Sequence, residues 1–163
     1  MKSHELIGFM PASMASEIME FTYAEDREVY RAILAGVAQA QKVRPVFLER
    51  KPRSERHPVM LNVLTRASMD AVAGNLLRSF FLKKHKGMLE DFLNALGIAH
   101  KEGVVEDVPE RMEDDRVRAA VDTLLQKHPH PAVAVYLHLF NDMNTPRWEN
   151  LDRILESDPR LQF

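Results

Sequence analysis

The stretch VMLNVLTRASMDAVAGNLLRSFFLKK, residues 59–84, is apolar on nearly every side and decides the fold. Its apolar residues recur three and four positions apart rather than two, which is the spacing of α-helices. A helix that is hydrophobic all round is buried on all sides. We therefore predict that this stretch is central to the core and that Ser68 and Asp70 restart it as a second helix. Pro58 suits the first turn of the helix, where its missing amide proton would have no partner.

Upstream, the sequence predicts one core helix and a connector. Thr22 and Glu25 have the spacing of a capping box, which predicts a helix over residues 23–42. Val29, Ile33 and Val37 fall on one apolar stripe of that helix. Several prolines interrupt the next stretch, KVRPVFLERKPRSERHP, which begins at Lys42. Each proline disfavours helix at the residue before it, so residues 43–58 are predicted to be a connector with room for one short helix.

Downstream, glycines and prolines mark the helix boundaries. Gly87 follows the cations of KKHK, and Gly97 follows the apolar face of MLEDFLNAL, so each is expected where a helix ends in a left-handed turn. Ile98 then folds back onto the preceding turn. Three further short helices are predicted in residues 113–157, the last of them capped by Thr145 with Pro146 at its first position.

The sequence thus predicts an all-α protein without significant sheet. We expect a single compact domain of about eight helices, arranged as an antiparallel or orthogonal bundle. Within it, residues 1–22 supply short N-terminal helices, residues 23–97 the central helices, and residues 113–157 a three-helix unit. Only residues 105–109, VEDVP, have room for a short extended piece.

The composition favours a soluble cytoplasmic protein. The chain has 163 residues with 22 basic and 24 acidic side chains, so its net charge gives no argument for nucleic acid or a membrane. It has no cysteine, which excludes disulfides, thiolate nucleophiles and cysteine metal ligands. No apolar run approaches the roughly 18 residues of a membrane span, and the N-terminal residues lack the apolar core of a signal peptide.

Charge is distributed unevenly along the chain. Seven basic residues lie between Lys42 and Arg66 against two acids, and seven acids lie between Glu102 and Asp115 against Arg111 alone. One interpretation is a site for an anionic partner, such as phosphate, RNA or an acidic protein surface, in the basic connector, residues 42–56. The other is that the basic and acidic regions face each other, within one fold or across a dimer, or are solvated. No aromatic residue interleaves the basic run ERKPRSERH, so we favour this second interpretation. The candidate phosphate ligands are Arg50, Lys51, Arg53 and Arg56.

Histidines and carboxylates supply the remaining candidates for a polar site. His138 and Asp142 are four residues apart on a predicted helix, a spacing that lets both bind one metal ion. They fall on a narrow polar stripe that we expect to face solvent, and no third ligand is apparent, so no metal is assigned. His100 and Glu102 fall on a loop after Gly97, and we expect His100 to point into water.

No catalytic template fits the sequence. There is no phosphate-cradling glycine loop, no nucleophile elbow and no two-histidine zinc helix, so no catalytic residue or cofactor is assigned. We predict a non-enzymatic protein-interaction module whose partner is another protein or a second copy. The alternative is binding of nucleic acid or another phosphorylated ligand through residues 42–56. An enzyme with a histidine and carboxylate site near His100 or His138 is third.

Overall fold

Helices are the only extended regular elements of the structure, as the sequence predicts. The computed structural model describes residues 1–163 and contains ten α-helices, two short 3-10 helices and no sheet. The structure thus has ten α-helices where the sequence predicts about eight. No helix combines the length and the apolar character that crossing a membrane requires. The contacts divide the chain into two compact units, Met1–Phe80 and Phe81–Phe163, and the single domain stays a prediction.

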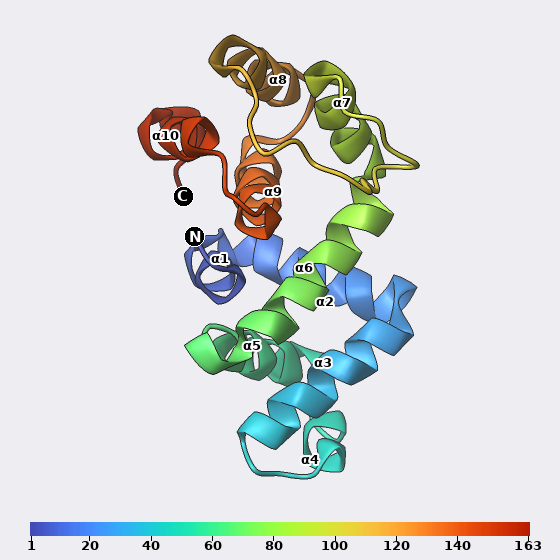
Figure 1. Ribbon diagram of the computed structural model, residues 1–163. Coiled ribbons are helices and arrows are strands. Elements are labelled where there is room, and N and C mark those ends of the chain that lie inside the picture. Colours follow the sequence, from blue (N-terminus) through green and yellow to red (C-terminus); the bar gives the residue numbers. More distant parts are fainter. The chain divides into compact units, whose positions relative to one another are not determined.

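Unit 1 is built around the apolar stretch from which the fold was predicted. Met60, Leu64, Leu76 and Phe80 of that stretch are fully buried, which confirms its central position. A 3-10 turn then interrupts the chain and α6 begins at Asp70, so the predicted restart is also confirmed. The helices of this unit (Figure 1) are α1 (Ser3–Phe9), α2 (Ala12–Glu25), α3 (Arg27–Ala40), α4 (Pro45–Glu49), α5 (Arg53–Leu64), η1 (Ala67–Met69) and α6 (Asp70–Lys84), which continues past the unit boundary.

The predicted helix start at Thr22 is wrong. Helix α2 continues through that position, and the Thr22 hydroxyl donates a hydrogen bond to the Ile18 carbonyl one turn earlier, at 2.8 Å. The cap is Asp26 instead, whose carboxylate accepts from the Val29 backbone amide at 3.4 Å. Threonine can bond back into its own helix as readily as it can cap the next one, so the spacing alone misplaced the boundary.

The predicted helix start at Pro58 is also wrong, because α5 begins five residues earlier at Arg53. Pro58 therefore lies inside the helix, where it removes one backbone hydrogen bond, at an exposed position. The connector accordingly ends at Pro52 rather than at residue 58. It contains α4, the one short helix for which the sequence left room.

Unit 2 packs its helices around α9, which is buried along most of its length. Phe92, Val121, Val133 and Leu137 are among the side chains of this core with no more than 1% exposure. Helix α7 packs against α8, and α9 contacts both α8 and α10. The helices of this unit (Figure 1) are α7 (Lys86–Leu96), α8 (Asp114–Lys127), α9 (His130–Met143), α10 (Glu149–Ser157) and η2 (Pro159–Leu161).

The structure confirms one predicted helix end in unit 2 and corrects the other. Gly97 adopts φ 72° and the Ile98 amide donates to the Leu93 carbonyl at 2.9 Å, the expected Schellman ending of α7. Gly87, by contrast, lies inside α7, because the chain breaks earlier, at His85.

The last helix begins three residues later than predicted. Pro146 lies in the loop before α10, after a cis Thr145–Pro146 peptide, and Trp148 rather than Thr145 is the residue that precedes the helix. The buried Asn141 side chain holds this loop: it accepts from the Trp148 amide at 2.9 Å and donates to the Trp148 carbonyl at 3.1 Å. These bonds from α9 decide where α10 starts.

Candidate functional site

A short exposed segment between α3 and α5 gathers both apolar and basic side chains. We call residues 42–51 the α4 tip. Pro45 starts helix α4, and Leu48 is the only buried residue of this five-residue helix. The other large apolar side chains remain outside: Val43 and Val46 are 39% exposed and Phe47 is 54% exposed. A helix this short has one inward position, so its remaining apolar residues face solvent.

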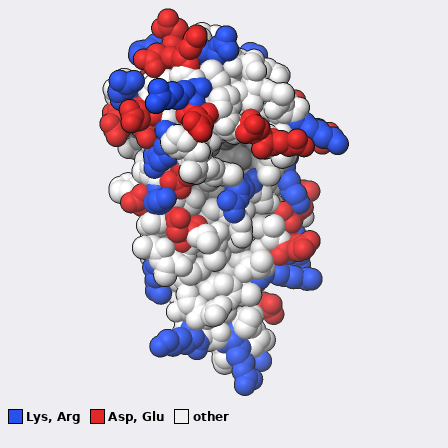
Figure 2. Space-filling model, in the orientation of Figure 1, with Lys and Arg blue, Asp and Glu red and all other residues white.

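The α4 tip is also basic. Figure 2 shows basic side chains projecting at the bottom of the view, where α4 lies in Figure 1. The basic side chains of residues 42–51 are all exposed, and none of them has a hydrogen-bond or ion-pair partner. Glu49 is the only acid of the tip. The four unpaired cations are Lys42, Arg44, Arg50 and Lys51.

Arg56, one of the predicted phosphate ligands, holds the tip in place. Its Nη2 donates to the carbonyl oxygens of Glu49 and Lys51 at 3.2 and 3.0 Å, and its Nη1 donates to the Tyr30 hydroxyl at 3.0 Å. The last carbonyls of a helix have no partner within the helix, so the guanidinium caps α4. Arg56 therefore fixes the position of the tip and has little capacity left for an anion.

A buried polar network lies behind Arg56. The Tyr30 hydroxyl is 2.9 Å from His57 Nε2, and His57 Nδ1 is 3.1 Å from Glu20 Oε1, although it is not aligned there for a hydrogen bond. Burial lowers the pKa of His57, and the negative charge of Glu20 opposes this shift. Burial likewise raises the pKa of Tyr30. The histidine and the tyrosine are thus both neutral near pH 7 and serve to join α3 to α5.

Arg53 is also engaged within unit 1. Its Nη1 lies 3.1 Å from Glu20 Oε2, and its guanidinium carbon is 4.4 Å from the centre of the Tyr23 ring. The structure therefore divides the four predicted phosphate ligands. Arg53 and Arg56 bind side chains and carbonyls of their own unit, whereas Arg50 and Lys51 remain free at the tip.

His100 neither points into a pocket nor extends into water. The half-buried ring braces the loop after α7: Nε2 lies 2.8 Å from Asn94 Oδ1, and Nδ1 accepts from the Gly103 amide at 3.1 Å. Glu102 next to it pairs with Lys86 Nζ at 3.1 Å. The expectation for His100 was wrong because the chain turns back at Glu102 and Gly103, which brings this amide to the ring.

The polar stripe of His138 and Asp142 does not face solvent, contrary to the prediction. His138 is 7% exposed, and burial lowers its pKa to about 4. Its ring lies 6.3 Å from that of Phe163, while Asp142 Oδ1 lies 3.3 Å from Arg147 Nη1. The loop before α10 and the C-terminal residue fold back over this side of α9, which a helical wheel cannot show. No group of three or more histidines and carboxylates is arranged to hold a metal ion.

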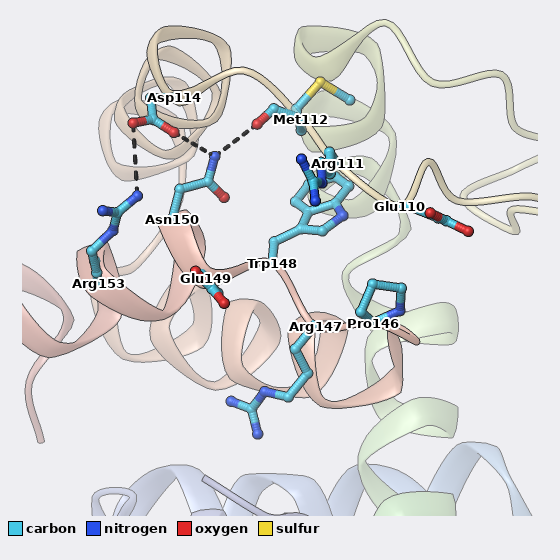
Figure 3. Close-up of a pocket in the computed structure, with 10 residues that line it drawn as sticks. All are labelled: Glu110, Arg111, Met112, Asp114, Pro146, Arg147, Trp148, Glu149, Asn150 and Arg153. Carbon is cyan, nitrogen blue, oxygen red and sulfur yellow. Dashed lines mark hydrogen bonds and ion pairs between the residues drawn. The ribbon is translucent and has the colours of Figure 1, made fainter.

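Unit 2 also has a pocket of about 440 Å³ between the chain before α8 and the start of α10 (Figure 3). Asn150 donates to the Met112 carbonyl at 2.7 Å and to Asp114 Oδ1 at 2.9 Å, and Arg153 lies 3.7 Å from Asp114 Oδ2. Arg147 points away from the other lining residues toward its own partners. The lining carries charges of both signs, so the pocket favours neither an anion nor a cation.

The α4 tip is thus a surface on which both apolar side chains and charges lack partners. The sequence predicts Arg50 and Lys51 as ligands at this surface but does not single out Val46 and Phe47. The signal for these two is an apolar pair on a helix too short to bury it. Comparison with protein-family models, with curated proteins and with solved structures finds no match to this chain.

Proposed function

We propose that this chain is a protein-interaction module that binds an acidic, apolar-containing segment of a partner protein through the α4 tip. The observation that carries the proposal is the exposure of Phe47, Val46 and Val43 among four cations without partners. Contiguous exposed apolar groups rimmed by charge mark interaction surfaces. The cations favour an acidic partner and increase its rate of encounter, while the apolar groups supply contact area.

The anchoring of the tip also supports binding. Arg56 and Tyr30 hold the end of α4 in one position, so the tip has little conformational freedom to lose when a partner binds. Pre-organisation of this kind lowers the cost of association.

Nucleic acid is the second candidate, and the same free cations favour it. Two observations count against it relative to a protein partner. Arg53 and Arg56, half of the predicted phosphate ligands, are engaged elsewhere. Phe47 is the only aromatic residue of the tip, whereas a surface that binds single strands stacks successive bases on several aromatic rings.

A photo-crosslinking amino acid at Val46 tests the proposal in cells of the source organism. We expect cross-links that map by mass spectrometry to an acidic segment of a protein. They should be lost in Phe47→Ala and in the double variant Arg50→Glu/Lys51→Glu. The double variant Arg31→Glu/Arg66→Glu makes the same charge change at exposed positions outside the tip and should keep them. Cross-links to RNA or lipid, or cross-links unchanged in the tip variants, would overturn the proposal.

A further inference from the structure

Residues 102–115 form the acidic segment, which runs from the loop after α7 into the first turn of α8. This segment has the properties expected of a ligand for the α4 tip. Seven of these residues are acidic and only Arg111 is basic. Glu102 pairs with Lys86, and Asp114 bonds to Asn150 and faces Arg153. The other five acids have no partner for their side chains: Glu106, Asp107, Glu110, Glu113 and Asp115.

The acidic segment also exposes apolar groups between its carboxylates. Val104 is 54% exposed, and Val105, Val108 and Met112 are half-buried. Acidic residues lie among valines in this segment, just as cations lie among Val43, Val46 and Phe47 at the tip. If the acidic segment binds the α4 tip, ion pairs and apolar contacts can therefore form in the same interface.

The path of the acidic segment is fixed by the rest of unit 2. His100 braces its start, the Trp148 indole donates to the Pro109 carbonyl at 2.8 Å, and Asn150 donates to the Met112 carbonyl at 2.7 Å. The carboxylates are thus presented from a held backbone rather than from a free tail. Two pre-organised surfaces lose less entropy on association than a surface and a disordered peptide.

We infer that the partner segment of the α4 tip is the acidic segment of a second copy of this chain. Neither the cations of the tip nor the five free acids have partners within their own unit, although the whole chain is nearly neutral with 22 basic and 24 acidic residues. A second copy supplies five free acids for the four free cations of the tip. A two-fold pair would join tip to segment twice, as isologous dimers do.

The inference rests on the proposed function and is tested by self-association. Sedimentation and light scattering from about 10 µM to about 1 mM protein should show a concentration-dependent dimer. Raising NaCl from about 50 to about 500 mM should weaken it at least about tenfold, because salt screens exposed charges. Arg50→Glu/Lys51→Glu and Glu106→Lys/Asp107→Lys should each weaken it by a similar factor, whereas Arg31→Glu/Arg66→Glu should not.

Charge exchange separates this pairing from general effects of charge. Each of the two weakened variants retains one native surface, so a mixture of them should form a heterodimer through the remaining tip and segment. All four changes in one chain should restore self-association. A wild-type chain that stays monomeric, or a tip variant that associates like the wild type, would overturn the inference. If the wild type is monomeric while Val46 cross-links to an acidic segment of another protein, the inference fails and the proposed function stands.

Discussion

The guanidinium of Arg56 connects the interior of unit 1 to its exposed tip. It makes four hydrogen bonds, three to the carbonyls of Glu49 and Lys51 and one to the Tyr30 hydroxyl. Arginine suits this position because its planar fork directs several donors at once, which a lysine ammonium cannot do. Arg56, which the sequence predicts as a phosphate ligand, thus supports the α4 tip instead.

Arg56→Lys is therefore expected to destabilise the protein by about 1–3 kcal/mol, since carbonyls at the end of α4 and the Tyr30 hydroxyl lose their donor. Arg50→Lys at the exposed tip should change stability by less than about 0.5 kcal/mol. Urea denaturation of both variants measures the difference. Equal stabilities for the two would show that Arg56 does not hold the tip.

His138 gives the folded state a dependence on pH. Burial lowers its pKa to about 4, whereas in the unfolded chain the imidazole titrates near its ordinary value of about 6.5. Between these values the unfolded state binds the additional proton, so stability is complete above about pH 6.5 and falls as the pH drops toward 4.

We expect the wild type to lose more thermal stability between pH 7 and pH 5 than His138→Gln, which cannot titrate there. Thermal unfolding of both proteins at the two pH values is the measurement. Parallel losses would mean that other groups account for the dependence.

At the scale of elements, the turn after α7 holds the polar loop that follows it close to that helix. Glu102 and Gly103 both have positive φ, 55° and 83°, and Lys101 and Val104 form a single antiparallel bridge around them. A Cβ atom on Gly103 would lie 3.1 Å from Leu89 Cβ. Two requirements, the left-handed backbone and the close approach to α7, therefore meet at one glycine.

Gly103→Ala should destabilise the protein by about 1–2 kcal/mol, because alanine is strained in this conformation and crowds Leu89. Gly87→Ala is the matched control: it lies inside α7 with nothing within 4 Å of an added Cβ atom. That change should stabilise the protein by about 0.5–1 kcal/mol, as alanine favours helix over glycine. Chemical denaturation should thus shift in opposite directions, and a shift of the same sign in both would contradict this description of the turn.

The sequence could predict those features whose causes are local. The left-handed end of α7 at Gly97 and the restart at Asp70 depend on neighbouring residues, and both were predicted. The N-cap of α3 is also a local feature. Thr22 and Asp26 both have side chains that can cap a helix, so the sequence pattern did not distinguish between them. The roles of Arg53 and Arg56 were out of reach, because their partners Glu20 and Tyr30 come from other helices.

At the scale of the whole molecule, α6 belongs to both compact units. Its residues up to Phe80 lie in unit 1 and those from Phe81 onward lie in unit 2, with no break in the helix. Leu76, Leu77 and Phe80 are fully buried, and Phe81 is 1% exposed. The buried residues of each unit thus include side chains of α6.

We therefore expect the two units to unfold together, as the predicted single domain requires. If unit 1 unfolded alone, α6 would lose the packing around Leu76 and Phe80, and an isolated helix of this length is marginal in water. A unit of about 80 residues also buries a smaller share of its surface than the whole chain does.

Trp148 is the only tryptophan and lies in unit 2, so its fluorescence follows that unit, while far-UV circular dichroism follows all helices. Urea transitions from the two probes should coincide. The comparison is best made with the Arg50→Glu/Lys51→Glu variant, in which the proposed self-association is expected to be weaker. A two-step dichroism curve with fluorescence following only one step would instead make the two units separate domains, because the continuity of α6 would then not couple their cores.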